Sequence, residues 1–181
     1  WYGKRPFSHM EEQVTQSVLK NEITELAPES SMDADQRKEV AGALTNIVAD
    51  AYRLYINTQG LHWNVEGPLF YSIHKLTESQ YAELAESIDE LAERVRALGL
   101  PAPQSLRELS ENSILRDLPD DADLKSRIER LVSDYERAVR RAALTVRLAE
   151  SNGDIKTADL LTHRVGVYEE NAWMLRATIA S

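Results

Sequence analysis

Apolar residues recur at intervals of three and four along most of this 181-residue chain. That spacing places them on one face of an α-helix, and it is sustained over stretches much longer than a β-strand. No alternating pattern of the strand type competes with it. The periodicity predicts four long helices, over Asp35–Asn64, Leu69–Leu98, Asp121–Ser151 and Asp154–Ile179. We therefore expect an all-α protein.

Glycine and proline interrupt the periodic pattern between these segments. Gly67-Pro68 separates the first segment from the second, and Gly99 follows the second as a helix stop. Residues 99–120 contain several prolines and only one short helical stretch, Ser105–Ser110. A connection of this length lets a chain cross from one end of a bundle to the other. The sequence predicts a four-helix bundle with a short helix in the long crossover between the second and third helices.

The two parts of the chain differ in pattern. Residues 36–181 form the predicted bundle, a single domain of ordinary size. Residues 1–35 lack a sustained period, and we expect an N-terminal tail with at most a short helix over Glu11–Leu26. Because the chain begins with Trp1 rather than Met, we expect it to be processed or truncated, and no signal peptide is recognisable in it.

The composition restricts the environment and the partners. The chain is 43% hydrophobic and 28% charged, which is typical of a soluble globular protein. No apolar run approaches the roughly 18 residues of a membrane span. The net charge of −9 disfavours nucleic acid as the default partner and favours cations. The absence of cysteine excludes disulfides and thiolate metal sites, and a cytoplasmic location is expected.

Two histidines and three carboxylates surround the predicted turn and follow the second helix: His62, His74, Glu78, Asp89 and Glu93. His74 and Glu78 are four residues apart and share a helix face, as do Asp89 and Glu93. His74 and Asp89 are separated by 15 residues, which is roughly 22 Å of helix, so one metal ion cannot contact both within one chain. Two copies packed antiparallel about a twofold axis would bring the histidines of one to the carboxylates of the other. Imidazole and carboxylate together suit iron and similar divalent metals.

The same stretch resembles the Dps proteins, or mini-ferritins. The resemblance rests on Leu61-His62-Trp63-Asn64-Val65-Glu66-Gly67-Pro68-Leu69-Phe70, on His74, on Asp89-Glu90-Leu91-Ala92-Glu93-Arg94 through Leu98-Gly99, and on Ala172-Trp173-Met174-Leu175-Arg176. Histidine, histidine, aspartate and glutamate follow one another at spacings of 12, 15 and 4, which is the ferroxidase pattern of that family. The similarity extends over about residues 36–180.

This resemblance implies a ferritin-like four-helix bundle that assembles into a hollow homo-dodecamer. It also implies a ferroxidase that oxidises Fe²⁺ with hydrogen peroxide or O₂, stores the ferric mineral and protects against oxidative damage. The catalytic ligands would be His62 and His74 of one chain with Asp89 and Glu93 of its partner, and Glu78 is a further acidic candidate. Other divalent metals, such as zinc, are expected to fit the same ligands.

The acids near the predicted turn between the third and fourth helices, and Trp63, each have two interpretations. Glu150, Asp154 and Asp159 lie around the predicted turn between the third and fourth helices. Acids there stabilise a helix N-terminus, or, as the resemblance implies, they line the pores through which iron enters. Trp63 and Trp173 are interpreted as packing residues, and for Trp63 the resemblance adds the role of a redox aromatic that absorbs oxidising equivalents.

Two rival functions stay open. Many Dps proteins also bind and protect DNA in the nucleoid, commonly through lysine-rich tails. Here the start carries only Lys4, Arg5 and Lys20, and the C-terminus has no basic tail, so the charge does not favour DNA. A bundle with a structural role alone would require the ligand spacing to be coincidental. The other two histidines, His9 and His163, are expected to have surface or packing roles.

Overall fold

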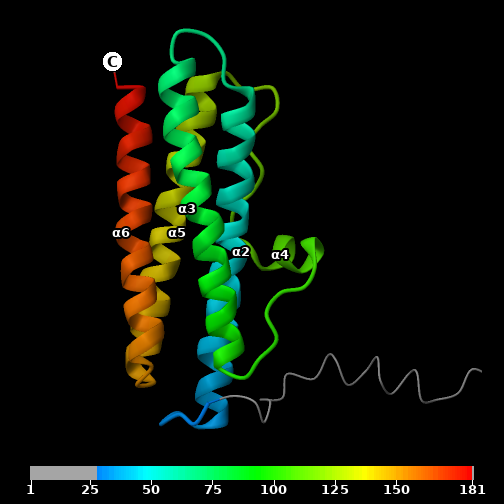
Figure 1. The fold of residues 1–181 in the computed structure, drawn as a ribbon, viewed down its shortest axis with the longest axis vertical. Helices are drawn as coiled ribbons and strands as arrows, with labels where there is room; N and C mark the ends of the chain where they lie inside the picture. Colours follow the sequence, from blue (N-terminus) through cyan, green and yellow to red (C-terminus); the bar gives the residue numbers. More distant parts are fainter. Residues whose placement is uncertain (1–27, 181) are drawn as a thin grey trace, which may run out of the picture.

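The structure, a computed structural model, describes residues 28–180, and in this part of the chain all regular secondary structure is helical. Among these residues four long helices form a bundle, and a fifth, short helix lies beside it (Figure 1). The helices are α2 (Ala34–Asn64), α3 (Phe70–Ala97), α4 (Leu106–Asn112), α5 (Leu124–Ser151) and α6 (Ile155–Thr178). The predicted all-α bundle with a short crossover helix is confirmed. The helix predicted over Glu11–Leu26 lies outside the described residues.

The order of the helices in space follows from the long crossover. Helices α2 and α3 are antiparallel neighbours joined by a short turn, and α5 and α6 form a second antiparallel pair. The crossover carries α4 and returns the chain along the bundle, so that α5 runs parallel to α3 (Figure 1). Contacts between α2 and α5 and between α3 and α6 join the two pairs. As a result, the α2–α3 turn and the α5–α6 turn lie at opposite ends of the bundle.

Local capping sets where the helices begin. The Asp33 carboxylate accepts a hydrogen bond from the backbone N–H of Gln36 at 2.9 Å, and the Gln36 side chain accepts one from the Asp33 N–H at 2.9 Å. This capping box fixes the start of α2. In α5, Asp123 accepts a hydrogen bond from the Ser126 N–H at 2.7 Å. The helix therefore begins at Leu124, three residues later than the periodicity predicts.

Glycines end two of the long helices. Gly99 has a positive φ of 94° and follows α3. Its N–H donates to the Arg96 carbonyl at 2.9 Å, while the Leu100 N–H donates to the Val95 carbonyl at 3.4 Å. These are the two bonds of a Schellman motif, which needs a residue that tolerates left-handed backbone. The same motif at Gly153, with φ of 73°, turns the chain from α5 into α6.

The interior consists of two apolar clusters, one at each end of the bundle. The cluster near the α5–α6 turn includes Val40, Leu44, Ile47, Val48, Leu91, Val95, Leu98, Leu160 and Leu161. The cluster near the α2–α3 turn includes Leu54, Leu61, Ile73, Leu84, Ile128, Leu131, Tyr135 and Leu175. Burial of each large aliphatic side chain contributes about 1.5–3 kcal/mol. None of the helices between residues 28 and 180 has the length and apolarity needed to span a membrane.

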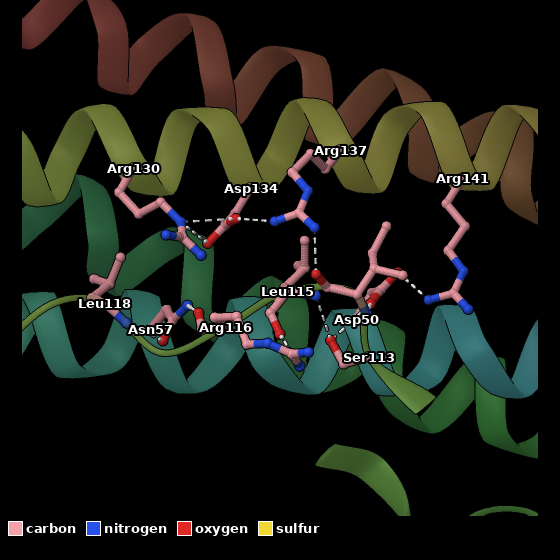
Figure 2. Close-up of polar contacts among 11 residues, drawn as sticks. Asp50, Asn57, Ser113, Leu115, Arg116, Leu118, Arg130, Asp134, Arg137 and Arg141 are labelled. Carbon is pink, nitrogen blue, oxygen red and sulfur yellow. Dashed lines mark hydrogen bonds and ion pairs between the residues drawn. The ribbon is translucent and has the colours of Figure 1, made fainter. Parts of the chain in front are cut away.

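Buried polar side chains attach the crossover to the bundle (Figure 2). Asp50 on α2 is 1% exposed. Its carboxylate accepts hydrogen bonds from the Ser113 hydroxyl at 2.8 Å and from the Ile114 N–H at 3.0 Å, and it pairs with Arg141 on α5 at 3.1 Å. Two turns further along α2, Asn57 bonds the following crossover backbone through both its amide nitrogen and its amide oxygen. The crossover is therefore fixed to both α2 and α5.

A second buried acid, Asp134, lies on α5 beside the same crossover (Figure 2). Burial raises the pKa of its carboxyl group, and the neighbouring Arg130 and Arg137 oppose that rise. Arg137 also donates to the Ile114 carbonyl of the crossover. The Asp134 carboxylate thus orients Arg137, and Arg137 holds the crossover from the α5 side.

Candidate metal centre

The α2–α3 turn brings His62 and His74 face to face. His62 lies in the last turn of α2, and His74 lies in the second turn of α3. Their rings stack with centroids 3.8 Å apart and planes inclined by 19°. The break at Gly67 and Pro68 positions them in this way, because it reverses the chain within a few residues and makes the two helices antiparallel. The sequence prediction that both histidines belong to one half-site is consistent with this geometry.

Each histidine is oriented by the backbone of the other. His62 Nδ1 lies 2.9 Å from the His74 carbonyl oxygen, and His74 Nδ1 lies 3.1 Å from the His62 carbonyl oxygen. A carbonyl oxygen only accepts, so Nδ1 of each neutral ring carries the hydrogen. The lone pair is then on Nε2 in both rings, which is the arrangement of a metal-binding imidazole supported by a second hydrogen bond.

The surroundings of the pair are aromatic on both sides. Phe70 stacks on His74 at a centroid distance of 5.0 Å, and Tyr81 meets His62 edge-on at 5.1 Å. His62 is buried, with 7% of its surface exposed, whereas His74 is half-buried. The Thr77 hydroxyl donates to the Ile73 carbonyl at 2.7 Å and lies 3.4 Å from His62 Nδ1. This packing restricts rotation of His62, so its Nε2 is held in a fixed direction.

Glu78 places a carboxylate one helical turn beyond His74. Its side chain is about half exposed (46%) and pairs with Lys75 at 2.7 Å. The hydrogen bond and charge of Lys75 lower the pKa of Glu78, and nearby His62 and His74 lower it further. The carboxylate is therefore anionic near the histidines. Its role as a metal ligand stays a prediction.

Asp89 and Glu93 lie further along α3, toward the α5–α6 end of the bundle. Both are exposed and lie one turn apart. Within residues 28–180, no three His, Asp or Glu side chains come close enough together to hold a metal ion. One chain therefore brings together the two histidines but leaves Asp89 and Glu93 at a distance, as the helix spacing predicts.

The acidic residues at the α5–α6 turn differ in their surroundings. Asp154 is 3% exposed and caps α6 by accepting from the Thr157 N–H at 3.0 Å. It also pairs with Arg94 of α3 at 2.7 Å. The helix-capping interpretation is therefore confirmed for Asp154. Glu150 and Asp159 are exposed, and the pore-lining role of all three acids stays a prediction.

The interpretation of the tryptophans as packing residues is wrong for the single chain. Trp63 is 69% exposed and Trp173 is 63% exposed. Both lie on helix faces that point away from the interior formed by the four helices. His163 is exposed on α6, which supports the surface alternative of its predicted surface or packing role, and His9 lies outside the described residues.

Sequence reasoning overlooked Tyr81 and Thr77, which contact His62. Tyr81 is seven residues after His74, and that spacing of two helical turns was a signal that it shares the face of the histidine. The pairing of Arg94 with Asp154 has no comparable signal, because the two residues lie on different helix pairs.

Comparisons with known proteins agree with this architecture. The ferritin-like domain family matches residues 41–181. DNA protection during starvation protein 2 of Bacillus anthracis is 34% identical over 143 residues, which cover 77% of this chain and 96% of that protein. A low temperature-induced protein of Nostoc is 37% identical over 147 residues, which cover 80% of this chain and 82% of that protein.

Solved structures give the same result. Dps from Thermosynechococcus elongatus superposes with a TM-score of 0.78 at 28% identity, covering 81% of this chain and 94% of that one. Dps from Vibrio cholerae, described as a member of a broad superfamily of ferritin-like diiron-carboxylate proteins, gives 0.79 at 29% identity, covering 87% of this chain and 99% of that one. With its helix order, its histidine pair and these similarities, the chain belongs to the Dps family of ferritin-like proteins.

Proposed function

We propose that this protein is a ferroxidase that oxidises Fe²⁺ at sites shared between two chains and stores the ferric product in a hollow homo-dodecamer. The observation that carries the proposal is the reciprocal hydrogen bonding of His62 and His74. With Nδ1 of each ring occupied in this way, Nε2 is the nitrogen that can donate a lone pair to the Fe²⁺ substrate, and within residues 28–180 no hydrogen bond engages it. Zn²⁺ is expected to compete for the same donors, since imidazole suits both metals.

The second half of each site comes from a partner chain in this proposal. Asp89 and Glu93 are exposed, and at the helical rise per residue they lie roughly 22 Å and roughly 28 Å along α3 from His74. Twofold, antiparallel packing of two α3 helices places this carboxylate pair opposite the partner's histidines, and the same contact is made twice. The two carboxylates balance the charge of Fe²⁺, and Glu78 adds a further negative group beside the imidazoles.

The proposed reaction consumes Fe²⁺ and hydrogen peroxide together. Two Fe²⁺ ions each give one electron to one hydrogen peroxide molecule, whose O–O bond breaks to yield two hydroxide ions. Because peroxide is reduced by two electrons, no hydroxyl radical is released. O₂ is the slower alternative oxidant. The ferric ions then hydrolyse to a mineral inside the shell, and the released protons return to solvent.

The rival function is DNA protection in the nucleoid. Both functions would be carried out in the cytoplasm. The net charge of −9 argues against DNA protection, because binding to DNA depends on cationic side chains that displace counterions. We expect weak binding to duplex DNA near physiological salt, measured by titration of a labelled duplex. Tight binding with a steep salt dependence would favour the rival.

Mixing of two inactive variants tests the shared site. One variant carries His62→Ala and His74→Ala, and the other carries Asp89→Ala and Glu93→Ala. Each alone should oxidise Fe²⁺ very slowly. After unfolding, mixing in equal amounts and reassembly, half of the twofold pairs contain one chain of each kind, and each such pair has one complete site. Roughly a quarter of the wild-type activity should return, as the symmetry of the interface requires.

A matched control uses the other carboxylates of the same helix. Glu86 and Glu90 are also four residues apart and exposed on α3, and their double replacement by alanine should leave the oxidation rate near that of wild type. If mixed and correctly assembled shells recover no activity, each chain builds its own site and the proposal of a shared site fails.

A further inference from the structure

Five polar side chains meet inside the bundle where α3 packs on α6. We call them the polar layer: Gln80 and Glu83 of α3, and Arg164, Tyr168 and Asn171 of α6. Arg164 pairs with Glu83, and its guanidinium carbon lies 5.6 Å from the centroid of the Tyr168 ring. Gln80 Nε2 donates to the Asn171 carbonyl oxygen at 3.4 Å. These contacts, with the spacing of three and four residues along each helix, place the five side chains in one group.

The polar layer lies between the two apolar clusters of the interior. On α6, Leu161 belongs to the cluster near the α5–α6 turn, and Leu175 belongs to the cluster near the α2–α3 turn. Arg164, Tyr168 and Asn171 lie between these leucines at helical spacing, so they share the face that the leucines present to the interior. Polar side chains therefore occupy positions that an apolar core would give to residues such as leucine.

Burial leaves the polar layer with hydrogen-bonding capacity that protein atoms do not use. Its members Gln80, Arg164, Tyr168 and Asn171 are 3%, 2%, 1% and 7% exposed. Within residues 28–180, seven buried side-chain nitrogen or oxygen atoms have no hydrogen-bond partner, and five of these belong to the polar layer: Gln80 Oε1, Glu83 Oε2, Arg164 Nη1, Tyr168 Oη and Asn171 Nδ2. An unpartnered buried polar atom destabilises the folded state, and native proteins contain few of them. Five in one place therefore indicate a bound partner that is not a protein atom.

We infer that the polar layer is a binding site for ordered water, with roughly two molecules per chain. The free oxygens of Gln80 and Glu83 only accept hydrogen bonds, and the free nitrogens of Arg164 and Asn171 only donate them. Water does both, and one buried water makes about three hydrogen bonds to otherwise unsatisfied groups, so five atoms require roughly two molecules. Burial raises the pKa of Tyr168, so its hydroxyl stays protonated and can donate or accept.

The charges of the polar layer suit water better than a metal ion. Glu83 is the one carboxylate of the layer, and Arg164 neutralises it. The Arg164 guanidinium would also repel a cation placed beside it. In the described part of the chain, no three His, Asp or Glu side chains lie close enough together to hold a metal ion.

Glu83 gives the layer its contact with solvent. Its side chain is 35% exposed, whereas its Oε2 atom is buried. The carboxylate therefore borders solvent on one side and the layer on the other, and its pairing with Arg164 closes the layer. Exchange of the bound water is expected to take place beside Glu83, between α3 and α6.

A crystal structure of the assembled, metal-free wild type tests the inference directly. At a resolution that shows ordered water, the electron density should place roughly two water molecules per chain within hydrogen-bonding distance of the five atoms. A well-ordered layer in which the five atoms bond to one another without water would overturn the inference. Because no iron is present, the result is independent of whether the protein is a ferroxidase.

Oxygen-17 relaxation dispersion of the solvent counts long-lived internal waters in solution. The variant with Gln80→Leu and Asn171→Leu removes polar partners from both helices and fills their space with apolar side chains. It should hold roughly two fewer long-lived waters per chain than wild type. Glu86→Leu with Glu170→Leu is the matched control, because it changes one exposed residue on each of the same two helices. The control should keep the wild-type number.

A second variant keeps the test decisive if the first does not assemble. Glu83→Leu with Arg164→Met removes both charges at once, and replacement of a whole buried ion pair by apolar residues of similar volume is often tolerated. This variant should also lose the bound water. If the variants that assemble keep the wild-type number of internal waters, the polar layer is not the water site and the inference fails. If neither variant assembles, the crystal structure of wild type decides between bound water and direct pairing.

Discussion

Replacement of Asp50 by alanine should release the crossover from the bundle and lower the free energy of unfolding. The carboxylate is 1% exposed and binds Ser113, Ile114 and Arg141 at once (Figure 2). Loss of one partner of a buried ion pair costs about 3–5 kcal/mol. Arg141 is 22% exposed, so water partly replaces its lost partner. We therefore expect the lower end of that range, about 3 kcal/mol.

The isosteric change Asp50→Asn separates charge from shape. An amide oxygen still accepts from the Ser113 hydroxyl and the Ile114 N–H, but the charged bond to Arg141 is lost. A hydrogen bond to a charged group contributes about 1.5–3 kcal/mol, so we expect a loss of about 2 kcal/mol. For a domain of this size, 1 kcal/mol corresponds to about 2–4 °C in melting temperature. The loss of about 3 kcal/mol expected for the Asp50→Ala variant should therefore lower its melting temperature by about 6–12 °C relative to wild type.

The assay is thermal unfolding of the assembled proteins at one fixed concentration, because assembly makes the melting temperature depend on concentration. Asp117→Asn is the matched control. Asp117 lies on the same crossover and pairs with Arg53, but its side chain is 76% exposed, so its loss should cost less than about 1 kcal/mol. Equal melting temperatures for the Asp50→Ala and Asp117→Asn variants would show that Asp50 does not hold the crossover.

Two further predictions concern the α5–α6 turn. Replacement of Glu150 by Gln together with Asp159 by Asn should slow iron uptake at low Fe²⁺ without changing particle size, and uptake kinetics identical to wild type would rule out these acids as an entry path. Burial raises the pKa of Asp154, but the hydrogen bonds of Thr157 and the pairing with Arg94 outweigh it and hold this pKa below its ordinary value. Asp154→Asn should therefore destabilise the protein at neutral pH, and its melting temperature should approach that of wild type as the pH falls below the ordinary aspartate pKa of about 3.9. A difference that stays constant down to pH values below that range would contradict the assignment.

The sequence alone determined the extent of the helices and the position of the breaks. Both depend on local properties: apolar residues at helical spacing, and glycines such as Gly99 and Gly153 that adopt positive φ. The separation of the ligands also followed from the sequence, because the rise per residue fixes the distance from His74 to Asp89 along one helix. Among the predicted helix bounds, the start of α5 had the largest error, since periodicity does not show which nearby acid caps a helix.

Tertiary structure decided everything that depends on two helices meeting. The direction of the two Nε2 atoms follows from the hydrogen bond that each of His62 and His74 makes to the backbone carbonyl of the other, and the edge-on contact of Tyr81 with His62 follows from the seam between α2 and α3. The exposure of Trp63 and the attachment of the crossover to Asp50 likewise had no sequence signal. The physical reason is that spacing fixes which residues share a face of one helix, whereas the rotation of each helix against its neighbours fixes which faces touch.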